Sequence, residues 1–183
     1  MSFGIDESRE KVSVSIAVLT VSDTRSEETD SSGRLLVERA RAAGHRVHAK
    51  LILKDDRETI AAQLRAWVGS GAVDVILVTG GTGITGRDVT PDAMLDVIEK
   101  EIPGFGELLR QISLRTVGLS AIQSRATAGV AGNTLIFAIP GSTGACRDAW
   151  DEILVHQLDS RYRPCNFVEI MPRLDEHLRR TKS

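Results

Sequence analysis

The sequence predicts an α/β fold with three layers, in which helices cover both faces of a doubly wound, mostly parallel sheet. Residues 14–79 alternate short apolar segments with helical segments of about ten residues or more, a pattern typical of right-handed crossovers between parallel strands. Residues 75–78 are apolar without interruption, as expected of a strand buried on both faces. A two-residue turn signal at 132–133 adds one antiparallel hairpin strand.

The first half of the chain contains five expected elements. They are a strand at 14–21, a helix at 35–43, a strand at 47–53, a helix that begins after position 56, and a strand at 75–79. Asp56 is suited to cap the second helix, because its carboxylate can accept a backbone N–H of the first turn. Glycine tolerates the left-handed conformation that ends many helices. We therefore expect Gly44 to follow the first helix, and Gly69 and Gly71 to stop the second.

Residues 22–33, which follow the first strand, form a polar stretch with four acidic side chains. These are Asp23, Glu27, Glu28 and Asp30. Such a composition is typical of a solvated loop. Ligands of open α/β sheets, however, bind beyond the carboxyl ends of the strands, which makes the same stretch a candidate wall of a binding site. The sequence leaves both interpretations open.

The second half of the chain is expected to continue with helices and a hairpin. In order, these are a short helix from Pro91 that is interrupted at 103–104, a helix at 105–115, a short helix at 121–125, hairpin strands at 128–131 and 134–139, a helix after Ser142, and a strand at 167–171. Trp67 and Trp150 fall on apolar helix stripes. We therefore expect both in the core or in a subunit interface rather than against a ligand.

Length and composition predict one globular domain. The 183 residues are 42% hydrophobic and 26% charged, which is ordinary for such a domain. We expect a single domain over 1–183, with its core at about 14–170 and flexible tails at 1–11 and 179–183. The net charge is −2 and the chain has no block of basic residues, so composition gives no indication of nucleic acid binding.

The apolar segment at 12–21 is too short to span a bilayer, and no small-residue cleavage site follows it. We therefore expect no membrane association, no signal peptide and, by default, a cytoplasmic location. Cys146 and Cys165 form no zinc-binding pattern with the histidines of the chain. They are expected to be free thiols in a reducing compartment.

The stretch at 79–93 reads Thr-Gly-Gly-Thr-Gly-Ile-Thr-Gly-Arg-Asp-Val-Thr-Pro-Asp-Ala and follows the uninterrupted apolar strand. Its glycines permit positive φ angles and let backbone N–H groups approach a ligand. Such loops bind phosphates, because their amides and the N-terminus of the following helix face the anion. We expect Thr90 to cap that helix and Pro91 to be its first residue. Arg87 and Asp88 place a cation and a carboxylate at the rim.

This pattern is neither the Gly-x-Gly-x-x-Gly fingerprint nor a P-loop, since no Gly-Lys-Ser/Thr follows. The alternative is a turn that only connects two packed elements. Glycines at this density beside an Arg-Asp pair favour a ligand-binding loop, which we predict here. A second strand–turn–helix unit occurs at Pro140, Gly141 and Ser142. It is either another anion-binding turn or an ordinary helix start capped by Ser142.

Several of these segments together resemble the MoaB/MogA family of molybdenum cofactor biosynthesis proteins. They are residues 79–83 with 87–93, 102–107, 124–125 and 139–142. The resemblance extends over about 14–170 and implies the molybdenum cofactor biosynthesis fold. Residues 141–146 and 163–167 are similar to the MoaB branch of the family. The adenylyltransferase branch carries a lysine after its Pro-Gly pair, where this chain has none.

The resemblance implies a reaction and a set of site residues. The family transfers an adenylyl group from ATP to molybdopterin, with Mg²⁺ as cofactor and pyrophosphate as product. The implied catalytic and metal-binding residues are Asp55 and Asp88, although Asp55 could instead be a turn residue and Asp88 a partner of Arg87 or part of a helix start. The implied substrate-binding residues are Thr79, Gly80, Gly81, Thr82, Gly83, Arg87, Thr90, Pro140, Gly141 and Ser142.

The resemblance also implies partners: molybdopterin and ATP as ligands, a homotrimer or dimer of trimers as assembly, and other enzymes of cofactor biosynthesis. Two hypotheses about activity remain open. Asp55 and Asp88 favour an active, magnesium-dependent adenylyltransferase. The missing lysine favours a protein that binds molybdopterin without turnover.

Overall fold

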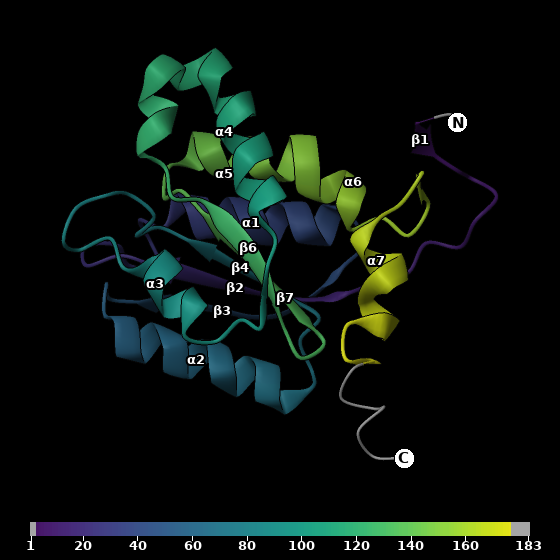
Figure 1. The fold of residues 1–183 in the computed structure, drawn as a ribbon, viewed down its shortest axis with the longest axis horizontal. Coiled ribbons are helices and arrows are strands. Elements are labelled where there is room, and N and C mark those ends of the chain that lie inside the picture. The colour runs from purple at the N-terminus through teal and green to yellow at the C-terminus, as the bar shows by residue number, and fades with distance from the viewer. Residues whose placement is uncertain (1–2, 177–183) are drawn as a thin grey trace.

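The computed structural model describes residues 3–176 and confirms the three-layered α/β fold (Figure 1). Its central sheet has six strands in the order β3-β2-β4-β7-β6-β5. The first four of these in space are mutually parallel, whereas β6 and β5 each run antiparallel to their neighbour. The strands are β2 (Ser15–Val21), β3 (Arg46–Leu53), β4 (Val75–Thr79), β5 (Lys100–Glu101), β6 (Thr127–Ala131) and β7 (Thr134–Ile139).

Helices cover the sheet on both sides, with α2 on one side and α1, α4 and α5 on the other (Figure 1). One face carries α1 (Ser31–Ala42), α4 (Pro103–Val117) and α5 (Thr143–Ala149), the last continued by η2 (Trp150–Leu154) and α6 (Val155–Gln157). The other face carries α2 (Arg57–Ser70) and α3 (Thr90–Leu95). Every residue of β2, β4 and β7 is buried, as their apolar sequences predict. Within residues 3–176, no helix combines the length and the apolarity needed to cross a bilayer.

Trp67 and Trp150 lie in the two cores, as expected from their helical spacing. Trp150 packs among α1, α5 and the sheet, and Trp67 packs on the α2 side. Both side chains are buried.

Two helix boundaries differ from the sequence prediction. Helix α1 begins at Ser31 and not at 35, because Asp30 accepts the amide of Gly33 at 2.9 Å and caps the helix. Helix α2 continues through Gly69 and ends at Ser70, and its C-cap Gly71 adopts the left-handed conformation with φ 63°. Gly44 follows the C-cap of α1, as predicted.

The start of α3 also differs from the prediction. Thr90 is the first residue of the helix and Pro91 the second, so Thr90 is not the N-cap. The Thr90 hydroxyl instead donates to the carbonyl of Gly80 at 2.8 Å, and the Thr90 amide donates to the carbonyl of Gly81 at 3.0 Å. The side chain therefore fixes the glycine loop rather than the helix end.

The second half of the chain differs from the prediction in four places. The short strand β5 was not predicted, and the interruption expected at 103–104 is the start of α4. The short helix expected at 121–125 is the 3₁₀-helix η1 (Gly118–Gln123). The predicted strand at 167–171 is wrong. This segment forms α7 (Phe167–Ile170) and η3 (Met171–Arg173), because Asn166 accepts the amide of Glu169 at 3.0 Å and caps a helix.

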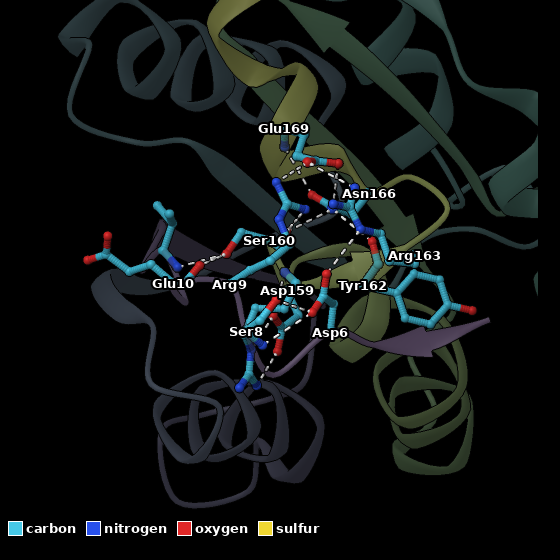
Figure 2. Close-up of polar contacts among 12 residues, drawn as sticks. Asp6, Ser8, Arg9, Glu10, Asp159, Ser160, Tyr162, Arg163, Asn166 and Glu169 are labelled. Atoms are coloured by element: carbon cyan, nitrogen blue, oxygen red, sulfur yellow. Dashed lines mark hydrogen bonds and ion pairs between the residues drawn. The ribbon is translucent and has the colours of Figure 1, made fainter. Parts of the chain in front are cut away.

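The N-terminal segment packs on the C-terminal part of the chain, as Figure 2 shows. Strand β1 (Gly4–Ile5) pairs antiparallel with β8 (Tyr162–Arg163). The guanidinium of Arg9 donates to the carbonyl of Ser160 at 2.8 Å and forms an ion pair with Glu169. Residues 4–11 of the tail predicted at 1–11 thus contain paired and hydrogen-bonded positions. The tail predicted at 179–183 lies outside the described residues.

Candidate active site

A cavity of about 450 Å³ opens at the carboxyl ends of the parallel strands. It brings together most of the residues that the sequence predicted as a site: Asp55, Thr79, Gly80, Gly81, Thr82, Gly83, Asp88, Pro140 and Gly141. These residues come from the ends of β3, β4 and β7, which is where an open α/β sheet binds ligands. Three other predicted residues do not line the cavity, namely Arg87, Thr90 and Ser142.

The floor of the cavity is formed by the glycine turns after β4 and β7. Gly80 has a φ of 104°, and a methyl group there would lie 2.1 Å from the carbonyl oxygen of Val21. A methyl group on Gly141 would lie 3.1 Å from the Cα atom of Gly80. The two turns therefore pack backbone to backbone against each other and against the end of β2. Only glycine fits the crowded left-handed position at 80.

Asp88 is held by its own loop. Its Oδ2 atom accepts the amide of Thr85 at 2.8 Å and the Thr85 hydroxyl at 2.6 Å. These hydrogen bonds lower the pKa of Asp88, so its carboxylate is charged at neutral pH. The absence of a side chain at Gly83 leaves the space that this carboxylate occupies, because a methyl group there would lie 2.7 Å from Asp88 Oδ2.

Asp55 reaches the glycine loop from the end of β3. A methyl group on Gly81 would lie 3.0 Å from Asp55 Oδ1. The Asp55 carboxylate therefore lies beside Gly81, and the Asp88 carboxylate beside Gly83 of the same loop. Burial raises the pKa of Asp55, and the negative charges of Asp23 and Asp88 raise it further. The charge of Asp55 is therefore destabilised in the free protein, and a bound cation would relieve this.

Arg87 pairs with Asp23 and not with Asp88. Its guanidinium donates from Nε to Asp23 Oδ2 at 3.0 Å and from Nη2 to Asp23 Oδ1 at 2.7 Å. The interpretation of Asp88 as a partner of Arg87 is therefore wrong. The pair with Asp23 joins the glycine loop to the loop after β2, and this hydrogen bonding lowers the pKa of Asp23.

Thr90 and Ser142 have structural contacts. Thr90 is buried and holds the carbonyl of Gly80, as described above. The hydroxyl of Ser142 accepts the amide of Ala145 at 3.2 Å and caps α5, which corresponds to the ordinary helix start considered from the sequence.

Arg125 is a positioning residue whose role the sequence did not reveal. Its Nε atom donates to the carbonyl of Gly83 at 2.8 Å, and its Nη2 atom donates to the carbonyl of Asp88. The same guanidinium forms an ion pair with Asp92 at 2.9 Å. Arg125 thus fixes both ends of the segment that carries the Asp88 carboxylate. In the sequence, Arg125 was marked only by the similarity of residues 124–125 to the MoaB/MogA family.

The loop after β2 forms a wall of the cavity rather than only a solvated surface. Ser22, Arg25, Asp30 and Ser32, from the stretch that was a candidate wall, line the cavity. Thr20, Val21, Gln123 and Ser124 line it as well and were not predicted as site residues. Asp30 is buried and accepts the hydroxyl of Thr20 at 2.8 Å and the ammonium of Lys50 at 2.8 Å. Burial alone would raise the pKa of Asp30, but the hydrogen bonds from Lys50, the Gly33 amide and Thr20 together lower it.

A mostly parallel α/β sheet with glycine turns and carboxylates at the ends of its strands is typical of α/β domains that bind ligands at that edge. The family can be stated more closely. Residues 17–160 match the model of the family described as "Probable molybdopterin binding domain". The chain belongs to this family, within the MoaB/MogA group of molybdenum cofactor biosynthesis proteins.

Individual relatives agree with this assignment. The chain is 52% identical over 160 residues to molybdenum cofactor biosynthesis protein B of Escherichia coli K12, covering 87% of this chain and 94% of that protein. A crystal structure of a molybdenum cofactor biosynthesis protein B matches with a TM-score of 0.78 and 40% identity, over 94% of this chain and 99% of that one. The MoaB structure from Thermus thermophilus, described as a molybdopterin biosynthesis enzyme, matches with a TM-score of 0.70 and 36% identity, over 77% of this chain and 89% of that one.

Proposed function

We propose that this protein acts in molybdenum cofactor biosynthesis by binding molybdopterin in the cavity and adenylylating it with ATP and Mg²⁺. The observation that carries the proposal is the meeting of Asp55, Asp88 and the glycine loop at one cavity of about 450 Å³. Backbone amides suit the phosphate oxygens, and carboxylates suit a divalent cation. The similarity to a protein described as a molybdopterin biosynthesis enzyme supports an enzymatic role.

The proposed reaction is a nucleotidyl transfer. An oxygen of the molybdopterin phosphate attacks the α-phosphorus of ATP, a new P–O bond forms, and the bond to pyrophosphate breaks. The protein supplies little covalent chemistry in such a reaction and acts by positioning and by electrostatic stabilisation. The glycine loop after β4 offers amides for phosphate oxygens, and the turn at Gly141 forms the adjoining part of the floor.

The residues present fit a magnesium ion that is held jointly with phosphates. No group of three or more His, Cys, Asp or Glu side chains in the described part of the chain could hold a metal ion alone. Mg²⁺, however, keeps several waters and needs only one or two carboxylates besides substrate phosphates. Asp55 and Asp88 would hold it, and the positive charge of the ion would offset the cost of burying the Asp55 carboxylate, which is the main cause of its raised pKa. When bound, the ion would neutralise charge that develops on the phosphates.

The test is to incubate the purified protein with molybdopterin, ATP and Mg²⁺ and to measure pyrophosphate and adenylylated molybdopterin. We expect both products in equal amounts, and none when Mg²⁺ is removed by a chelator. Omitting molybdopterin serves as the control for plain ATP hydrolysis.

A second candidate function is molybdopterin binding without turnover. It is favoured by the turn after β7, where residues 140–144 carry no charged side chain and Ser142 caps α5. Tight molybdopterin binding without pyrophosphate release in the same assay would establish this alternative and reject the enzyme proposal.

We also propose that the chain assembles into a trimer or a dimer of trimers through an apolar face on α4 and η1. Leu119 and Ile122 are 86% and 84% exposed there, next to Leu114 in an apolar groove. Exposed patches of this kind mark interaction surfaces. We expect Leu119→Glu to reduce the mass measured by light scattering to that of one chain. Leu95→Glu, at an exposed leucine of α3, is the matched control and should leave the mass unchanged.

A further inference from the structure

The wall of the cavity formed by the loop after β2 carries a positive charge. We infer that Arg25 on this wall binds a phosphate group of the ligand. This inference rests on the proposed function, because it names a further residue for the same site.

The cavity lining is rich in negative charge. Asp30, Asp55 and Asp88 all line it, and Arg25 is the one cationic side chain that does so among residues 3–176. A phosphorylated ligand would meet three carboxylates in a partly closed space, which is unfavourable unless cations compensate. Mg²⁺ at Asp55 and Asp88 would compensate on one side, and Arg25 stands on the wall formed by the loop.

The cations around the cavity differ in whether a carboxylate already neutralises them. Arg87 pairs with Asp23 at 2.7 Å, Lys50 with Asp30 at 2.8 Å, and Arg125 with Asp92 at 2.9 Å. Arg25 has no carboxylate partner in the part of the chain that the structure describes. Its Nη1 atom donates to the carbonyl oxygen of Thr29 at 3.0 Å. A guanidinium has five N–H donors, so most of those on Arg25 remain for a ligand.

Three of the four acidic residues of the same loop do not line the cavity and accept hydrogen bonds from other groups. Asp23 accepts from Arg87, Glu27 from Lys50 at 2.8 Å, and Glu28 from the hydroxyl of Ser26 at 2.6 Å. The composition of the loop is acidic. Two of its charged side chains line the cavity, namely Asp30 and Arg25.

The backbone that carries Arg25 is ordered by hydrogen bonds within the loop. The hydroxyl of Ser22 accepts the amides of Thr24 and Arg25, each at 3.2 Å. The amide of Ser26 donates to the hydroxyl of Thr29 at 2.9 Å, and the bond from Arg25 to Thr29 fixes one side of the guanidinium. Such preorganisation reduces the entropy lost when a phosphate binds. Arginine also matches phosphate geometry with two parallel N–H donors.

The experiment compares Arg25→Gln and Arg25→Lys with Arg34→Gln in the full chain. Arg34 is a matched control, since it is exposed, donates to a carbonyl of the same loop (Glu28, at 3.1 Å) and does not line the cavity. Affinities for ATP, inorganic pyrophosphate and molybdopterin are measured by equilibrium dialysis. We expect Arg25→Gln to weaken at least one of these affinities about tenfold or more, Arg25→Lys to retain part of it, and Arg34→Gln to match the parent.

The three ligands identify which phosphate Arg25 contacts. Weaker ATP and pyrophosphate binding with unchanged molybdopterin binding assigns Arg25 to the nucleotide, whereas the reverse assigns it to the molybdopterin phosphate. The inference is overturned if Arg25→Gln binds all three ligands like the parent, if Arg34→Gln loses as much affinity, or if the parent binds none of them. A parent that binds these ligands but releases no pyrophosphate would reject the proposed reaction and leave the role of Arg25 to be decided by the binding data.

Discussion

Replacing Asp88 by asparagine is expected to lower pyrophosphate release by about two orders of magnitude or more, which is the scale of losing one electrostatic contact to a transition state. Asparagine keeps the shape and one acceptor oxygen, but it removes the negative charge that would help hold Mg²⁺. Charge develops on the departing pyrophosphate only as the reaction proceeds, so the loss should fall on turnover more than on substrate affinity. Molybdopterin affinity should change far less, because we assign that ligand to the backbone amides of the glycine loop.

The structure makes this substitution a clean test. Arg87 pairs with Asp23, so Asp88→Asn breaks no ion pair with Arg87. The asparagine side-chain oxygen can still accept from Thr85, which preserves the turn. The melting temperature should therefore stay close to that of the parent. Asp96→Asn removes the same charge from a carboxylate that pairs with Arg57 away from the cavity, and it should leave turnover unchanged. Parent-like turnover in Asp88→Asn would contradict a role for this carboxylate.

The parts of this fold that the sequence predicted are those with a strong local signal. Strands β2, β4 and β7 are buried on both faces, so their sequences are mostly apolar and mark them directly. Asp56 and Ser142 cap their helices as expected, because an N-cap acts within a few residues of itself. The glycine loop was evident because several glycines in a short stretch follow a buried strand.

The parts that were missed depend on contacts between distant residues or on competing local signals. The pair between Arg87 and Asp23 joins positions 64 apart, and β1 pairs with β8 across nearly the whole chain. Residues 167–171 are mostly apolar, as in a buried strand, yet the cap at Asn166 makes them helical. Arg25 stands among acidic residues, and only the structure shows that Asp23, Glu27 and Glu28 do not line the cavity. Sequence patterns record local preference, whereas the charge that faces a cavity is decided by tertiary packing.

The glycine loop provides a second test of Asp88 that leaves the charge in place. A methyl group on Gly83 would lie 2.7 Å from Asp88 Oδ2, so Gly83→Ala requires the carboxylate to move. Because a flexible side-chain end can yield at little cost, we expect the fold to be retained. A displacement of about 1 Å in a catalytic group can cost up to about a hundredfold, so we expect turnover to fall tenfold to hundredfold.

Gly86→Ala is the matched control for this substitution. A methyl group there would meet no atom within 4 Å, and Gly83 and Gly86 both lack the positive φ that would add backbone strain. Gly81 is unsuited to the comparison, since its φ of 62° penalises any side chain and a methyl group would lie 2.6 Å from the Thr90 hydroxyl. Pyrophosphate release, molybdopterin affinity and melting temperature are measured on both variants. Equal turnover in Gly83→Ala and Gly86→Ala, with both proteins folded, would show that the position of Asp88 does not limit the reaction. If turnover falls in Gly83→Ala but not in Gly86→Ala, and also falls in Asp88→Asn, the reaction depends on both the charge and the position of the Asp88 carboxylate.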